Sequence, residues 1–335
     1  MNGYDALLLA SFGGPEGPDE VVPFLENVVR GRPVPAERLQ EVARHYDHFD
    51  GVSPINAQNR ALLTALIAEL NANGPPLAVY WGNRHWHPLL EDTVRQMAED
   101  GITRAMAFCT SAFGSYPGCR QYREDIERAR KAVGEGAPSI EKLRLFYNHP
   151  GFIEATAERV AEALTEITAD HGSAFSTVFT AHSLPLSMAS SSPYERQLRE
   201  ACGLVAERAG LAQWHLAYQS RSGPPAQPWL EPDVGHVIRT LATEGVDCLI
   251  LVPIGFVSEH MEVVYDLDVE AADLCEELGV DMVRASTVGC HSRFVQMIRQ
   301  LAVEKLDPSA PRLAVGNDGP SADDCDPACC PRPGE

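Results

Sequence analysis

The amino-acid sequence predicts an α/β protein made of two similar Rossmann-like domains, each doubly wound around a four-stranded parallel sheet. Short apolar runs alternate with amphipathic helical segments along the chain, which is typical of βαβ units. Each apolar run ends in a turn rich in glycine, proline or small polar residues. The same order of runs and turns occurs in both halves, so we interpret the halves as a duplication with the active-site cleft between them.

The first half is predicted to form a domain over residues 1–150. Strands are expected at the apolar runs 6–10, 77–81, 104–110 and 143–147, and helices at 57–72, 89–99 and 120–133. The segment between the first two strands is longer than its counterpart in the second half. We therefore interpret residues 13–56 as an insertion that forms a lid or wall over the cleft.

The second domain is predicted over residues 151–316. Strands are expected at residues 176–180, 215–218, 248–253 and 282–286, with a helix over 293–305. Matching turns support the duplication, because Ala-Ser-Phe-Gly-Gly-Pro at 10–15 corresponds to Ala-His-Ser-Leu-Pro at 181–185. Residues 317–335 are polar and rich in proline, and we interpret them as a flexible tail.

The composition is that of an acidic globular protein. The chain of 335 residues suffices for two domains, and its formal net charge of −20 argues against nucleic acid or anionic membrane as a partner. No run reaches the roughly 18 to 20 apolar residues of a membrane span, and no basic segment precedes residues 6–10 as in a signal peptide. The sequence therefore predicts a cytoplasmic protein without stable membrane insertion.

An acidic row follows the predicted strand 248–253. A helix capped by Ser258 places Glu262, Asp266 and Glu270 within about 80° of arc on one face. Like charges at this spacing repel one another, so a row of them where α/β sheets bind ligands indicates cation or proton handling. A solvated helix face in an acidic protein is the alternative interpretation.

His182 directly follows the apolar strand 176–180, where a turn exposes it to the predicted cleft. A histidine that faces a carboxylate from another strand end is best explained as an acid–base or metal pair, and an uncharged imidazole accepts a proton near neutral pH. A lone histidine in this place is as often an ordinary core or surface residue. His260 lies about 200° around an ideal helix from Glu262, so it joins the same site only if the helix begins later or is distorted.

Other side chains fit a large, flat ligand that carries carboxylates. Arg30 and Arg32, beside Tyr46 and Ser53, suit charge-assisted bonds to carboxylates, although ordinary surface charge is an equal alternative. Aromatic residues near the strand ends suit a flat apolar ligand or the core; among them are Phe12, Tyr122 and Trp229. The sequence contains no dinucleotide, P-loop or nucleophile-elbow motif, and the pair His85 and His87 lacks further zinc ligands nearby.

These motifs together resemble the ferrochelatases, and in particular the actinobacterial enzymes that use coproporphyrin III. The resemblance rests on residues 8–15, 51–55, 180–185 (Thr-Ala-His-Ser-Leu-Pro), 218–224 with 228–230, and 253–268. It extends from residue 5 to about residue 305 and implies the chelatase fold.

The resemblance assigns roles to individual residues. It implies that His182 and Glu262 face each other across the porphyrin and coordinate Fe²⁺ or receive pyrrole protons. His260 is a secondary member of the predicted site because of its position on the helix. Asp266 and Glu270 continue an acidic path for metal or protons. The implied porphyrin contacts are Ser53 and Tyr122, with Arg30, Arg32 and Tyr46 near the propionates. Phe12 and Trp229 are added to the predicted contacts as aromatic residues near strand ends. Many low-GC Gram-positive relatives carry tyrosine where this chain has Phe12, and phenylalanine cannot ligate a metal.

The nine cysteines suggest a second centre, because three of them crowd into the polar tail. Several ferrochelatases hold a 2Fe–2S cluster, and the resemblance implies the ligands Cys119, Cys325, Cys329 and Cys330. Cys109 is the alternative to Cys119, and adjacent ligands such as Cys329 and Cys330 are geometrically awkward. Zinc, or a tail with free thiols, is the alternative to the cluster.

The resulting prediction is a lyase of haem biosynthesis that inserts Fe²⁺, its substrate, into coproporphyrin III to give Fe-coproporphyrin III and two protons. A chelatase acting on protoporphyrin IX, a cobalt chelatase and a non-catalytic porphyrin or haem carrier are the alternatives. The acidic row favours an enzyme over a carrier. We expect a monomer that makes transient contact with neighbouring enzymes of the haem pathway.

Overall fold

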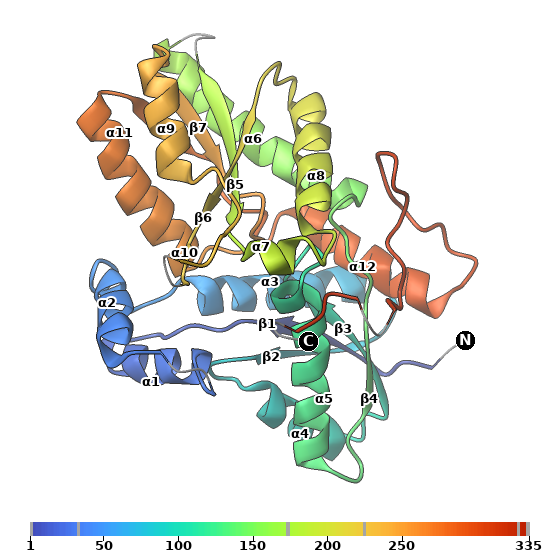
Figure 1. Ribbon diagram of the computed structural model, residues 1–335. Coiled ribbons are helices and arrows are strands. Elements are labelled where there is room, and N and C mark those ends of the chain that lie inside the picture. The colour runs from blue at the N-terminus through green and yellow to red at the C-terminus, as the bar shows by residue number, and fades with distance from the viewer. Residues whose placement is uncertain (1–2, 32–33, 172–174, 224–225, 327–328, 333–335) are drawn as a thin grey trace. The chain divides into compact units, whose positions relative to one another are not determined.

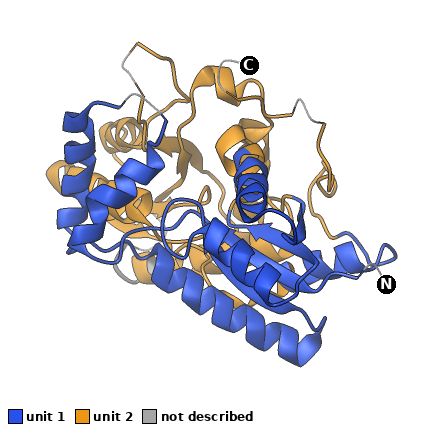
Figure 2. Ribbon diagram, turned by 90° about the horizontal axis from the view of Figure 1, so that it is seen from below, with its two compact units in different colours: residues 1–110, 121–144, 298–312 blue, residues 111–120, 145–297, 313–335 orange. Residues whose placement is uncertain are grey.

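The computed structural model describes residues 3–31, 34–171, 175–223, 226–326 and 329–332. The chain divides into two compact units, shown in different colours in Figure 2. Unit 1 comprises residues 1–110, 121–144 and 298–312, and unit 2 comprises residues 111–120, 145–297 and 313–335. The predicted domain boundaries at residues 150 and 316 divide the chain differently and stay predictions.

Unit 1 contains a parallel sheet with the strand order β2-β1-β3-β4. Its strands are β1 (Ala6–Ser11), β2 (Ala78–Asn83), β3 (Arg104–Cys109) and β4 (Ser139–Lys142). All six residues of β1 are buried, because this strand lies between two others and helices cover the sheet. The side chains of β1 therefore pack alternately on the two faces of the sheet.

Helices cover the two faces of this sheet (Figure 1). Buried side chains of α4 (Leu90–Glu99) and α5 (Gln121–Val133) share one apolar cluster with Ala6, Leu8 and Ala10 of β1. The helix α3 (Ile55–Asn73) lies on the opposite face, with Leu62, Leu66 and Leu70 buried. The segment between β1 and α3 forms α1 (Pro18–Val28) and α2 (Ala36–Asp47).

Unit 2 repeats this architecture. Its parallel strands are β5 (Ser176–His182), β6 (His215–Gln219), β7 (Cys248–Val252) and β8 (Asp281–Arg284), in the order β6-β5-β7-β8. Because this order corresponds strand by strand to that of unit 1, the prediction of two similar doubly wound domains with four-stranded sheets is confirmed.

The helices of unit 2 also form two layers (Figure 1). One layer contains α9 (Val234–Thr243) and the continuous run α10 (Met261–Tyr265), η2 (Asp266–Ala271) and α11 (Ala272–Leu278). The other contains α6 (Pro150–His171) and α8 (Tyr194–Ala209). The remaining helices are the short α7 (Leu186–Ala189), the π-turn η1 (Tyr116–Arg120), and α12 (Ser292–Leu306), whose residues are divided between the units. No helix in the described part of the chain is both long and apolar enough to cross a membrane.

The predicted strand at residues 143–147 is wrong. Strand β4 ends at Lys142, and only the amide of Leu143 extends the pairing, to the carbonyl of Ala107 at 2.8 Å. Phe146 and Tyr147 are instead buried in an aromatic cluster of unit 2, where the ring centroids of Phe146 and Phe152 lie 5.7 Å apart. The apolar run therefore indicates burial in the core and not pairing in a sheet.

Candidate active site

Two predicted site residues of unit 2 meet at the ends of their elements. His182 is the last residue of β5, and Glu262 lies in the first turn of α10. The Nε2 atom of His182 lies 3.5 Å from Oε1 of Glu262, and their side chains are 27% and 46% exposed. A ligand can therefore reach both groups.

The acidic helix begins later than the sequence predicts. His260, and not Ser258, is its N-cap residue: its backbone is extended, and its Nδ1 atom accepts a hydrogen bond from the amide of Glu262 at 3.2 Å. The late start brings His260 into the same turn as Glu262, which is the condition for it to join the site. Burial lowers the pKa of His260, against the raising effect of the Glu262 charge.

The electrostatics of the pair favour a charged imidazole. Burial lowers the pKa of His182. The charge and hydrogen bond of Glu262, together with the hydrogen bond to the Ser183 carbonyl, outweigh this effect and raise the pKa to about 9. Burial raises the pKa of Glu262, and the charge of His182 outweighs this and lowers it to about 2. The raised pKa of His182 favours the charged imidazole, so this group can accept a proton only after its pKa falls.

Asp266 is the next member of the acidic row and begins the π-helical segment η2. Its pKa is raised to about 7, chiefly by burial and also by the charges of Glu262 and Glu270, while a hydrogen bond from Ser220 lowers it. Glu270 is exposed, as the solvated-face interpretation expects, whereas Glu262 and Asp266 are half-buried. Asp266 can therefore exchange a proton near neutral pH.

Several residues that hold this site were not assigned a role from the sequence. The phenol of Tyr194 donates to the backbone carbonyl of His182 at 3.0 Å, and the side-chain amide of Gln219 donates to the carbonyl of Glu262. Ser220, which donates to Asp266, has a left-handed backbone with φ of 61°. The position of Gln219 and Ser220 at the end of β6 is the signal that could have identified them.

Arg284 of β8 also holds the turn that carries the acidic row. Its guanidinium lies 3.1 Å from Oε2 of Glu259 and 2.5 Å from Oδ1 of Asp268. These two carboxylates come from either side of the His260 and Glu262 turn. The arginine thus ties the end of β8 to both sides of this turn.

In unit 1, Phe12 and Tyr122 share a neighbour in Arg84. The guanidinium carbon of Arg84 lies 4.6 Å from the ring centroid of Tyr122 and 5.7 Å from that of Phe12. Its Nε atom lies 2.5 Å from Oδ2 of Asp125 on α5, and both side chains are almost fully buried. The ion pair therefore fixes the cation between the two rings, and burial raises the pKa of Tyr122.

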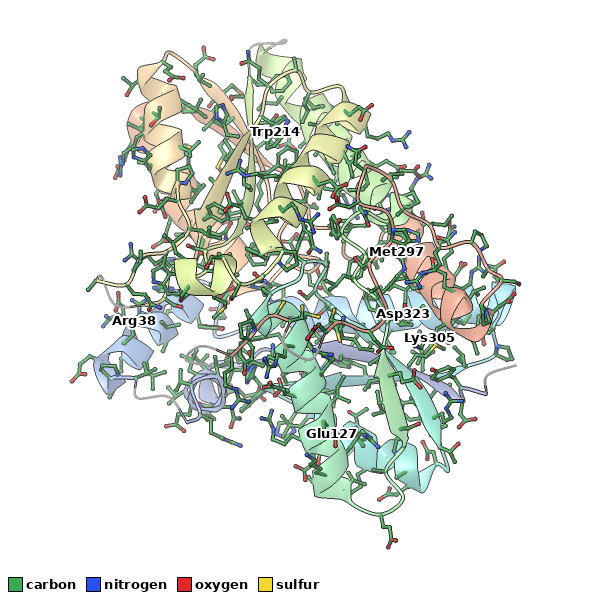
Figure 3. All side chains as sticks on the ribbon, turned by 45° about the vertical axis from the view of Figure 1, so that its right-hand side comes forward. Arg38, Glu127, Trp214, Met297, Lys305 and Asp323 are labelled. Atoms are coloured by element: carbon green, nitrogen blue, oxygen red, sulfur yellow. The ribbon has the colours of Figure 1, made fainter. Side chains whose placement is uncertain are left out.

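Loss of this ion pair is expected to destabilise unit 1. Asp125→Ala leaves the buried guanidinium of Arg84 without this carboxylate, which typically costs about 3–5 kcal/mol of unfolding free energy. The control is Glu127→Ala on the same helix (Figure 3), because Glu127 pairs with Arg130 at 2.6 Å at the surface and such pairs contribute less than about 1 kcal/mol. Urea denaturation followed by circular dichroism measures both changes. Equal costs for the two variants would contradict a stabilising role for the buried pair.

The remaining predicted porphyrin contacts lie in different surroundings. The amide of Ser53 donates to the carbonyl of Pro15 at 2.8 Å, and Tyr46 is buried with its ring centroid 6.3 Å from that of Phe24. The guanidinium of Arg30 donates to the side chain of Asn27. Trp229 of unit 2 is buried, whereas Arg32 lies outside the described residues.

The tail cysteines gather with Cys119 in unit 2. Hydrogen bonding to Cys119, together with burial and contact with Cys329, raises the pKa of the Cys325 thiol. The Sγ atoms of Cys329 and Cys330 are 3.4 Å apart. Cys119, Cys325, Cys329 and Cys330 all line one cavity of about 380 Å³. Cys109, the alternative to Cys119, belongs to unit 1.

The donor set of this cavity fits an iron–sulfur centre in type and number, since four thiolates ligate a 2Fe–2S cluster. Within the described ranges, no group of three or more His, Cys, Asp or Glu side chains is placed to hold a metal ion. The structure therefore places four thiols at one cavity, and among the described residues they do not have the spacing of a metal site.

Comparison with known proteins identifies the family. The model of the ferrochelatase family matches residues 4–306. The chain is 55% identical over 328 residues to a ferrochelatase of Rhodopirellula baltica, covering 98% of this chain and 93% of that protein. It is 52% identical over 316 residues to the coproporphyrin III ferrochelatase of Nocardia farcinica (92% and 90% covered), and 49% identical over 336 residues to that of Mycolicibacterium smegmatis (97% and 99% covered).

Solved structures of chelatases share the fold. SirB from Bacillus subtilis with Fe³⁺ matches with a TM-score of 0.56 at 13% identity, covering 91% of this chain and 98% of that one. The cobalt complex of the sirohydrochlorin chelatase SirB from Bacillus subtilis subspecies spizizenii matches with a TM-score of 0.52 at 13% identity, covering 90% and 97%. At this identity the similarity shows the fold alone. The family match over nearly the whole chain shows that this protein belongs to the ferrochelatase family.

Proposed function

We propose that this protein is a lyase that inserts Fe²⁺ into coproporphyrin III, giving Fe-coproporphyrin III and two protons in haem biosynthesis. The observation that carries the proposal is the accessible pair of His182 and Glu262, which joins a proton-exchanging imidazole to an oxygen ligand for iron. The names of the relatives from Nocardia and Mycolicibacterium support coproporphyrin III as the porphyrin.

The charge state of the pair suggests how the substrates trigger proton transfer. In the ligand-free protein, Glu262 holds a proton on His182, whose pKa is about 9. When Fe²⁺ binds the carboxylate of Glu262, the metal neutralises that charge, and the pKa of the neighbouring imidazole falls. The imidazole first passes its own proton to solvent by way of Asp266. As the metal enters the ring, the deprotonated imidazole accepts the two pyrrole protons one after the other, and it hands the first to solvent before it accepts the second.

Asp266 and Glu270 are proposed to relay protons or metal between this pair and solvent. The pKa of Asp266 is raised to about 7, so its carboxyl can both accept and release a proton at neutral pH. Glu270 lies further along η2 and is exposed. The secondary member of the site is His260, which lies in the same turn as Glu262.

The porphyrin is proposed to contact the aromatic, polar and basic side chains that the sequence singled out. Apolar and aromatic contacts would come from Phe12, Tyr122 and Trp229, with Ser53 as a polar contact. Arg30, Arg32 and Tyr46 would lie near the propionates, where guanidinium groups bind carboxylates well. Coproporphyrin III carries more propionates than protoporphyrin IX, so these residues favour the former.

Anaerobic insertion of Fe²⁺ by the purified protein tests the proposed activity directly. Loss of porphyrin fluorescence is expected with coproporphyrin III at a kcat/KM at least about tenfold above that with protoporphyrin IX. A preference for protoporphyrin IX would overturn the substrate assignment. Binding of both porphyrins without metal insertion would indicate a carrier instead of an enzyme.

The four gathered thiols are proposed to hold a 2Fe–2S cluster, which would supply a redox-active, electron-accepting group. Cys330→Ser removes one buried ligand and is expected to abolish the visible absorbance of anaerobically purified protein, together with its bound iron and sulfide. The matched control Cys290→Ser replaces an exposed thiol outside the cavity and should leave the spectrum unchanged. Bound zinc in place of iron and sulfide would identify the alternative centre.

We also propose that the protein works in the cytoplasm as a monomer. Transient contact with neighbouring enzymes would pass the porphyrin along the haem pathway. Sedimentation analysis at micromolar concentration tests the first part, and a stable dimer would contradict it.

A further inference from the structure

The segment before the tail cysteines is held against the rest of unit 2 by hydrogen bonds to its backbone. The amide of Val315 donates to the carbonyl of Asn148 at 2.9 Å, and the side-chain amide of Asn148 donates to the carbonyl of Gly319 at 2.8 Å. Asn148 is fully buried. Residues 315–319 therefore follow a defined path, in contrast to the flexible tail expected from composition.

Glu200 of α8 is the centre of this contact. Its Oε1 atom accepts hydrogen bonds from the amides of Asn317 at 3.1 Å and Asp318 at 3.4 Å. Its Oε2 atom accepts a hydrogen bond from the phenol of Tyr147 at 3.0 Å, which contributes with burial to raising the pKa of Tyr147 to about 12. One carboxylate thus binds two consecutive tail amides and is itself held by a buried phenol.

Two neighbours of Glu200 on α8 complete the arrangement. Arg196, one turn earlier, forms an ion pair with Asp318 of the tail. Gln197 is buried and accepts a hydrogen bond from the amide of Gly114 at 2.7 Å. Gly114 lies in the loop that leads to Cys119, whose own amide is bonded to the carbonyl of Ser115 at 2.9 Å. The same helix therefore holds both parts of the chain that bring thiols to the cavity.

Gly316 fits this contact because it lacks a side chain. Its backbone is left-handed, with φ of +83°, and a Cβ atom there would lie 2.4 Å from Oε1 of Glu200. Gly319 has a similar φ of +67°, but a Cβ atom there would meet nothing within 4 Å. Both glycines therefore have a positive φ that disfavours other residues, but only at Gly316 would a Cβ atom also clash with Glu200 of α8.

We propose that Arg196, Gln197 and Glu200 of α8 are positioning residues that dock the C-terminal tail and the Cys119 loop, so that the four thiols are gathered before any metal binds. The use of these thiols rests on the proposed 2Fe–2S cluster, but the docking itself does not. Because the tail is already ordered, binding of the metal centre does not have to pay the conformational entropy of ordering it.

Thiol reactivity in the metal-free protein tests the docking. Cys119 and Cys330 are only 4% and 3% exposed, so an alkylating reagent must wait for the tail to open. Glu200→Ala and Gly316→Ala are each expected to speed alkylation of both thiols, measured by mass spectrometry, by at least about tenfold. The matched control Gly319→Ala carries the same backbone strain without the clash with Glu200, so it should speed alkylation less than Gly316→Ala does. Glu200→Ala and Gly316→Ala should also bind less iron and sulfide after anaerobic purification, with thermal unfolding of the remaining protein unchanged.

The outcomes separate the two proposals. Wild-type alkylation rates in both Glu200→Ala and Gly316→Ala would overturn docking by α8. Fast alkylation with full iron and sulfide content would show that docking does not position the thiols. A wild-type protein without iron and sulfide would reject the cluster, while the alkylation rates would still decide the docking.

Discussion

Replacement of His182 by alanine is expected to lower kcat for Fe²⁺ insertion into coproporphyrin III by about 10²- to 10⁴-fold, the usual contribution of a positioned acid–base group. The imidazole lies 3.5 Å from the carboxylate of Glu262, so its loss removes the proposed proton acceptor. Anaerobic steady-state fluorescence measures the rate.

The matched control for this variant is His236→Ala. His236 is an exposed histidine on α9 of the same unit, and its replacement should leave turnover within about twofold of wild type. Turnover of His182→Ala near the wild-type value would rule out the proposed role of His182.

The second large effect concerns the pKa of His182 in the ligand-free protein. Glu262→Gln removes the charge that raises this pKa to about 9, while burial continues to lower it, so the value is expected to fall below about 7. NMR titration of the labelled imidazole measures the change. The control Glu276→Gln removes an exposed carboxylate on α11 and should leave the His182 titration in place.

A pKa of His182 that stays near 9 in Glu262→Gln would contradict the proposed trigger, because Fe²⁺ binding to Glu262 could not then release the proton.

The shifted pKa values of His182 and Glu262 also make the stability of the fold depend on pH. The raised pKa of His182 stabilises the fold fully below the ordinary imidazole value, and this contribution is lost as the pH rises through about 9. The lowered pKa of Glu262 contributes above its ordinary value and is lost as the pH falls through about 2.

The structure of the acidic row could be predicted only in part from the sequence. The spacing of Glu262, Asp266 and Glu270 was visible as a helical repeat, and all three lie on the continuous helical run from Met261 to Leu278. The π-helical turn η2 and the late helix start were not predicted. Arg284 of β8 forms ion pairs with Glu259 before the helix start and with Asp268 within η2, and a local repeat does not contain such long-range contacts.

The apolar run at residues 143–147 gives the complementary case. Its side chains are buried, as the sequence indicated, but in an aromatic cluster with Phe152 and not in a sheet. Hydrophobicity alone predicts burial, and periodicity cannot separate a short buried strand from an irregular buried segment. Sheet pairing requires backbone hydrogen bonds to a neighbouring strand, and the last of these is made by Leu143, directly after β4.

For this protein, the sequence by itself determined the two parallel sheets and the polar residues at their strand ends, because alternating apolar runs and turn residues are local patterns. It also pointed to His182 and Glu262 as partners through the resemblance of their motifs. Only the tertiary structure decided that the Glu262 carboxylate raises the pKa of His182 and that α8 contacts both the tail and the Cys119 loop. Charge states and long-range contacts depend on burial and distance, which exist only once the chain is folded.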